Sequence, residues 1–194
     1  MIEMNIHRNK IIEILAGFYL QKPSKQLLRL LKEFSLLFKE DLTADETFHQ
    51  AIDSLHEDRL PEAIQFYYDL NFVPGQLLKK PYESVYIENS FNGKITSRIK
   101  DAYLAWNFNP KKIIHQELLL KENARWDHAG YELAFIAMVM TVVPYDPEMA
   151  AFISERRWLF NLGEDLISSN EPYHQLLGFV TIEIMKVFQQ TIKA

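Results

Sequence analysis

The chain has 194 residues, of which 48% are hydrophobic and 24% charged, a balance typical of a globular protein large enough for one sizeable core. It contains no cysteine, which excludes disulfides, thiolate metal sites and cysteine nucleophiles. The formal net charge of −5 argues against a general affinity for nucleic acids and favours basic partners.

Hydropathy predicts neither a secretion signal nor a membrane span. Charged residues are frequent among the first ten positions, and no long apolar run follows them. The longest uncharged apolar run covers residues 133–143, whereas a membrane helix needs about twenty residues. An Arg156-Arg157 pair lies too deep in the chain to serve as an export signal. We therefore expect a soluble, cytoplasmic protein.

The first forty residues predict two amphipathic helices. Apolar side chains recur at helical spacing over residues 6–20, and Pro23 ends this helix. Ser24 can cap the next helix, whose apolar positions extend over residues 25–39.

Two further helices precede a long irregular segment. Thr43 and Glu46 have the spacing of a capping box, which predicts a third helix reaching residue 57. Pro61 suits the first turn of a fourth helix. Helical patterning then stops over residues 71–92, and a loop of this length inside a compact domain is more often functional than idle.

Helical patterning returns in the middle of the chain. One helix is predicted over residues 95–108 and a short one over residues 111–120, with Asn109-Pro110 between them. We expect a single all-helical domain over residues 1–194. The Asn109-Pro110 interval is the best candidate for a hinge between two lobes, which would comprise residues 1–109 and 110–194.

Residues 125–143 predict the helix around which the chain is organised. This stretch begins polar and is almost wholly apolar from Leu133 onward, so it belongs in the middle of the protein. A helix after Pro147 is expected to stop at Gly163, and the last helix covers residues 172–192. No convincing period-two run occurs, so the predicted fold class is all-α, a helical bundle of about eight or nine helices.

The start of this central stretch carries side chains capable of chemistry. His128 and Glu132 are four positions apart, the spacing of two metal ligands on a helix, and Asp127 is adjacent. No metal signature is complete, however, and the same spacing suits an ordinary pair on a helix surface, while Asp127 can cap nearby backbone. The sequence marks no nucleophile. We therefore predict no catalytic residue, no metal ligand and no cofactor.

A second stretch, Pro81-Tyr82-Glu83-Ser84-Val85-Tyr86, lies within the long irregular segment. It lacks the glycines and the lysine of a phosphate-binding loop. Its tyrosines either cover the core beneath the loop or form, with Phe72, an aromatic rim for an apolar peptide.

Together the two stretches resemble a known family. The segment from Phe72 to Tyr86 resembles the Pro-Tyr-Glu-Ser signature of the TorD/DmsD family of redox-enzyme maturation chaperones. The segment Asp127-His128-Ala-Gly-Tyr-Glu132-Leu-Ala-Phe135 is similar to that family's Asp-His-x-x-x-Glu-Leu-x-Phe motif. The order and separation of the motifs, the helical pattern and the chain length also agree. Family members often carry Glu-Pro two residues ahead of the Asp-His pair, where this chain has Ala124-Arg125-Trp126.

The resemblance implies a cytoplasmic chaperone rather than an enzyme. Members of the family bind the twin-arginine signal peptide, and often the body, of a molybdopterin-dependent oxidoreductase, and delay its export until the cofactor is inserted. The resemblance also implies monomers beside domain-swapped homodimers. By motif match, the expected peptide-binding residues are Tyr82, Glu83, Ser84, Asp127 and His128.

The chemistry of such a leader peptide adds further expected contacts. Its two guanidinium groups are best met by carboxylates, here those of Glu83, Asp127 and Glu132. Its apolar segment is best met by an aromatic groove. We expect the aromatic side chains of this groove to be those of Tyr82, Tyr86, Trp126 and Phe72.

Two alternatives of other classes stay open. One is a metal-dependent helical enzyme that uses His128, Glu132 and Asp127. The other is a helical scaffold module that recognises an unrelated protein.

Overall fold

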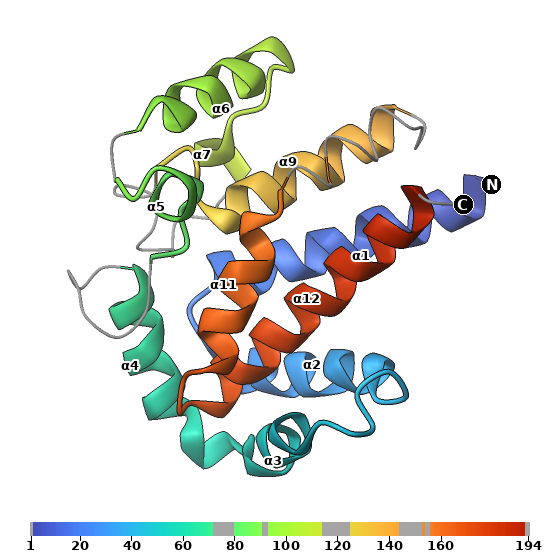
Figure 1. Cartoon of the computed structure of the whole chain (residues 1–194), viewed down its shortest axis with the longest axis vertical. Coiled ribbons are helices and arrows are strands. Elements are labelled where there is room, and N and C mark those ends of the chain that lie inside the picture. The colour runs from blue at the N-terminus through green and yellow to red at the C-terminus, as the bar shows by residue number, and fades with distance from the viewer. Residues whose placement is uncertain are drawn as a thin grey trace. The chain divides into compact units, whose positions relative to one another are not determined.

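The structure, a computed structural model, describes residues 2–71, 80–90, 93–113, 125–143, 153 and 156–192. Helices dominate these residues, which contain no strand; they include one isolated bridge, between Tyr82 and His128. The predicted all-α class is confirmed. In chain order the elements are α1 (Ile2–Leu20), α2 (Lys25–Ser35), η1 (Leu36–Phe38), α3 (Glu46–Ser54), η2 (Glu57–Arg59), α4 (Leu60–Asn71), α5 (Glu83–Ile87), α6 (Lys94–Ala105), α7 (Pro110–Ile113), α9 (Ala129–Val142), α11 (Trp158–Ile167) and α12 (Pro172–Ile192) (Figure 1).

The chain divides into two compact units whose segments alternate along the sequence. Unit 1 comprises Met1–Gln21, Pro81–Trp158 and Val187–Ala194, and unit 2 comprises Lys22–Lys80 and Leu159–Lys186. Each unit therefore combines segments from both halves of the chain. The Asn109-Pro110 interval lies inside unit 1.

In unit 1, α1 packs along α9 (Figure 1). Helix α9 is buried on most of its circumference, as its apolar sequence predicts. It begins at Ala129 rather than at residue 125, because His128 has extended backbone and caps the helix. Gly130 permits the close approach of α1, since a Cβ at this position would lie 2.5 Å from Leu20 Cγ.

Helices α2 and α3 of unit 2 begin at capping side chains. Ser24 caps α2 as predicted, and its hydroxyl accepts a hydrogen bond from the Leu27 N–H at 3.2 Å. The capping box predicted from Thr43 is wrong. Asp45 caps α3 instead and accepts from the Phe48 N–H at 3.0 Å. A cap must directly precede the first helical residue, and Asp45 holds that position while Thr43 does not.

Helix α11 continues through Gly163 to Ile167, so the predicted stop at Gly163 is wrong. A glycine is required at this position because a side chain would collide with the neighbouring helix. In unit 2, a Cβ on Gly163 would lie 3.0 Å from the Gly178 carbonyl oxygen, and a Cβ on Gly178 would lie 2.5 Å from the Gly163 carbonyl oxygen. The pair lets the backbones of α11 and α12 approach closely.

Several predicted features lie outside the described residues. They include Phe72 and the rest of residues 72–79, the start of the helix predicted after Pro147, and the predicted short helix beyond Ile113. None of the helices in the described ranges combines the length and the apolar character that a membrane crossing requires.

Candidate functional site

The two motif stretches meet in unit 1 at a loop–helix junction, formed by residues 81–84 and 127–130. The Glu83 N–H donates to the Asp127 carbonyl oxygen at 2.9 Å, and the Ala129 N–H donates to the Pro81 carbonyl oxygen at 2.8 Å. These bonds accompany the antiparallel bridge between Tyr82 and His128. Backbone pairing thus joins segments that are more than 40 positions apart, as the 43-residue separation of Ser84 and Asp127 shows.

Asp127 strengthens the junction with its side chain. Its carboxylate is fully buried and accepts a hydrogen bond from the Ser84 N–H at 3.1 Å. That N–H belongs to the first turn of α5, where a helix leaves its N–H groups without helical partners and favours a negative charge. Asp127 therefore caps a helix distant in sequence rather than the one that follows it.

Replacing Asp127 by alanine is expected to lower the free energy of unfolding by about 1–2 kcal/mol, because the buried Ser84 N–H loses its acceptor. Asparagine at position 127 keeps an acceptor oxygen and should cost less. Urea unfolding of both variants measures the effect. Equal losses for alanine and asparagine would contradict the assigned hydrogen bond.

His128 caps α9 with its ring. Its Nδ1 accepts a hydrogen bond from the Gly130 N–H at 3.1 Å, which places the proton of the neutral ring on Nε2. The ring packs edge-on against Tyr82, with centroids 5.3 Å apart. Burial lowers the pKa of His128 from 6.5 to about 3. The side chain is therefore neutral near pH 7.

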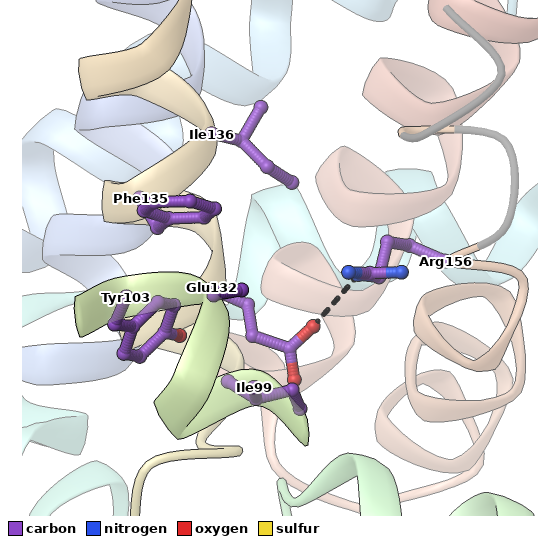
Figure 2. A pocket seen from close by; sticks show the side chains of 7 residues that line it. Ile99, Tyr103, Glu132, Phe135, Ile136 and Arg156 are labelled. Atoms are coloured by element: carbon purple, nitrogen blue, oxygen red, sulfur yellow. Dashed lines mark ion pairs between the residues drawn. The ribbon is translucent and has the colours of Figure 1, made fainter. Parts of the chain in front are cut away.

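Two buried carboxyl groups lie next to the junction. Glu83 and Glu132 are 6% and 3% exposed. Burial raises the pKa of Glu83, and it raises that of Glu132 well above its ordinary value, with the Glu83 charge acting in the same direction. Arg156 opposes both shifts, and its Nε lies 3.0 Å from Glu132 Oε2 (Figure 2).

Glu132 and Arg156 face each other across a small pocket. Tyr103 and Phe135 pack together beside them, with ring centroids 4.8 Å apart. The Tyr103 hydroxyl is buried and has no hydrogen-bond partner among the described residues. The full lining is Ile99, Ala102, Tyr103, Glu132, Phe135, Ile136 and Arg156.

The two remaining predicted site residues lie apart from the junction's hydrogen bonds. Tyr86 is half-buried and packs against Trp158, with centroids 5.6 Å apart. Trp126 is also half-buried, and its ring centroid lies 6.1 Å from that of Tyr103. Lys100 Nζ lies 5.8 Å from the centroid of the Trp126 ring. Both side chains thus keep aromatic surface accessible near buried elements of unit 1.

Sequence reasoning missed Arg156 and Tyr103 as members of the site. The signal for Arg156 was present, since an arginine pair in an acidic chain is a distinctive feature. Tyr103 carried no signal, because an aromatic residue on the apolar side of a helix is ordinary core. Within the described residues, no group of three or more His, Cys, Asp or Glu side chains has the arrangement of a metal site.

The family model described as nitrate reductase delta subunit matches residues 36–143, more than half of the chain. No curated protein matches. A crystal structure of a protein from Archaeoglobus fulgidus, described as a redox enzyme maturation protein, is similar with a TM-score of 0.52 and 16% identity. The match covers 96% of this chain and 94% of that one, and it shows a shared fold.

The family match spans both motif stretches that form the junction. The all-helical fold extends the agreement over nearly the whole chain. The resemblance to TorD/DmsD chaperones drawn from those motifs is confirmed. This chain therefore belongs to the TorD-like family described as nitrate reductase delta subunit.

Proposed function

We propose that this chain is a cytoplasmic chaperone for a molybdopterin-dependent oxidoreductase. It binds the twin-arginine signal peptide of that enzyme, its apo form, or both, assists insertion of the cofactor and delays export until the enzyme is mature. Membership of the family supports a role in redox-enzyme maturation. The observation that carries the finer proposal is the loop–helix junction, which brings two motifs together beside a buried acidic pocket.

The eight predicted peptide-binding residues that the structure describes take different roles in this proposal. Ser84, Asp127 and His128 are fully buried, so they shape the site. Tyr82 packs edge-on against the His128 ring and supports the same framework. Of the remaining four residues, Tyr86 and Trp126 are half-buried and offer surface to the peptide. The carboxyls of Glu83 and Glu132 are buried and would meet an arginine that inserts beside them.

Charge and aromatic surface suit the two halves of a leader peptide. Glu132 already meets one guanidinium, since Arg156 Nε lies 3.0 Å from its Oε2, and Glu83 interacts with both groups. A leader arginine would favour the charged form of these carboxyls and gain charge-assisted hydrogen bonds. Tyr86 and Trp126 offer half-buried aromatic surface to the apolar segment that follows the arginines. We propose no catalytic role. The use of His128 Nδ1 as a cap favours the chaperone over the metal-dependent enzyme, because the ring proton is then on Nε2 and neither nitrogen offers a free lone pair to a metal.

Calorimetry with synthetic leader peptides tests the proposal. A leader with Arg-Arg should bind, and the same peptide with Lys-Lys should bind roughly tenfold more weakly, since lysine lacks the planar fork of guanidinium. Equal binding of both peptides, or of neither, would count against leader recognition. Co-purification from the native cytoplasm then identifies the client and shows whether the chaperone acts as a monomer or as a swapped homodimer.

Replacing Trp126 by alanine is expected to weaken leader binding about tenfold, because a half-buried aromatic contact with the apolar segment is lost. The matched control is Trp106→Ala. Trp106 is 43% exposed at the end of α6 and belongs to no part of the proposed site. Calorimetry should show unchanged affinity for the control, and circular dichroism should show that both variants are folded. A similar loss for both tryptophans would contradict the assignment of Trp126.

A further inference from the structure

The pocket of unit 1 holds a guanidinium group that belongs to the chain itself. Arg156 is the one cationic side chain among the lining residues, and its side chain is 15% exposed. Figure 2 shows the Glu132 carboxylate directed toward it, with Nε and Oε2 joined at 3.0 Å. Glu83 and Asp127 add negative charge that acts on Glu132. A guanidinium at this position therefore favours the charged form of Glu132, which burial and the acidic neighbours disfavour.

The walls of the pocket also suit a guanidinium. Tyr103 and Phe135 contribute aromatic rings, and Ile99 and Ile136 contribute aliphatic surface. A guanidinium group is planar and weakly hydrated, so it stacks on aromatic rings while its N–H groups meet a carboxylate. The buried Tyr103 hydroxyl, without a hydrogen-bond partner in the described residues, offers a further polar group to a ligand. An ammonium group would use only part of this lining.

The sequence around Arg156 has the order of a leader peptide. Arg156 is followed by the exposed Arg157 and then by Trp158, Leu159 and Phe160, an arginine pair directly before an apolar segment. A leader that presents the same groups to the same pocket would compete with Arg156 for Glu132.

We propose that this pocket is a guanidinium-binding site that the chain's own Arg156 occupies until an arginine of the client's leader takes its place. The Arg156–Glu132 ion pair is then an autoinhibitory contact. This inference rests on the proposed function only for the nature of the competitor, a leader peptide. That the pocket binds a guanidinium group does not depend on the proposed function. Occupation by Arg156 gives the buried Glu132 carboxyl a partner when no client is bound. Because every ligand must displace Arg156, its affinity for the pocket is reduced. A leader whose apolar segment makes additional contacts can offset this cost, whereas a free guanidinium cannot.

The first test needs no leader peptide. Arg156→Ala empties the site, and methylguanidinium at millimolar concentration should refill it and raise the melting temperature of this variant. Wild type and Arg157→Ala should respond less, because their sites are occupied. The double variant Glu132→Gln/Arg156→Ala should not respond, since its carboxylate is gone. Methylammonium controls for a general effect of cations. The absence of a specific response in Arg156→Ala would overturn the proposal.

The second test measures competition. Arg156→Ala should bind an Arg-Arg leader roughly tenfold more tightly than wild type, because nothing has to be displaced. Arg157→Ala, which removes an exposed arginine of the same pair, is the matched control and should not show this gain. If Arg156→Ala does not fold, Arg156→Lys replaces it, since a lysine is the weaker competitor in a site built for a planar fork. Unchanged or weaker leader binding would overturn the autoinhibitory contact.

The two tests separate this inference from the proposed function. If the leader binds wild type but methylguanidinium has no specific effect, the guanidinium site is wrong and the chaperone proposal stands. If methylguanidinium refills Arg156→Ala but the leader binds no variant, the proposed function fails and the competition fails with it. The inference as a whole requires both the refilling and the gain in leader affinity.

Discussion

Replacing Gly178 by alanine should lower the free energy of unfolding by about 2–3 kcal/mol, because the new methyl group overpacks the contact between α11 and α12. Its Cβ would lie 2.5 Å from the Gly163 carbonyl oxygen and 3.0 Å from the Ile167 backbone nitrogen. Backbone atoms of a buried helix cannot move aside as a flexible side chain can. Thermal denaturation should show the loss as a decrease of about 5–10 °C in the melting temperature of a chain this size.

Gly17→Ala is the matched control for this prediction. Gly17 also lies inside a helix, α1, but a Cβ there would meet only the end of the Gln21 side chain, at 3.4 Å. Alanine has the higher helix propensity, so this change should leave stability unchanged or raise it by up to about 1 kcal/mol. The same change from glycine to alanine is thus expected to destabilise the protein at position 178 but not at position 17. This difference separates the effect of packing from that of helix propensity. A Gly178→Ala variant as stable as wild type would contradict the close approach of the two helices.

Lowering the pH from 7 to 5 should cost the protein about 2 kcal/mol of stability through His128. Burial lowers the pKa of this histidine to about 3, whereas the unfolded chain takes up the proton near 6.5. Between these values the unfolded state binds more protons than the folded state. The contribution of His128 is therefore fully present above pH 6.5 and is lost as the pH falls toward 3.

His128→Asn isolates this effect, since asparagine is a good helix cap but does not titrate. The comparison is needed because Glu83 and Glu132 act in the opposite direction. Burial raises the pKa of both, so acidification toward 4.5 favours the folded state on their account. Urea unfolding at pH 7 and pH 5 gives the stability change of each protein. A change equal in wild type and His128→Asn would show that His128 is not buried in the neutral form.

Local patterns in the sequence predicted much of the helical framework. The apolar spacing of residues 25–39 predicts α2, and the position of Ser24 predicts its cap. The apolar run after Leu133 anticipated that α9 is buried on most of its surface. These predictions succeeded because helix periodicity and capping depend on residues a few positions apart.

The errors arose where distant segments meet. Because glycine often ends helices, the local pattern predicts a stop at Gly163, yet the backbone of α12 makes a glycine necessary inside α11. The local pattern also predicts that Asp127 and His128 belong to the central helix, but backbone bonds to Pro81 and Glu83 pair this segment with the loop, and the helix begins at Ala129. Neither cause is visible in the local pattern.

The sequence by itself determined the all-α class, most of the described helices and the two motif stretches that indicate the family. Only the tertiary structure decided that Asp127 caps α5, that His128 is a neutral cap of α9, and that Glu132 pairs with Arg156 in a pocket beside Tyr103. The physical reason is the distance along the chain over which each interaction acts. Periodicity and capping act within a turn or two of the chain, whereas hydrogen bonds, ion pairs and burial depend on which distant segments the fold brings together.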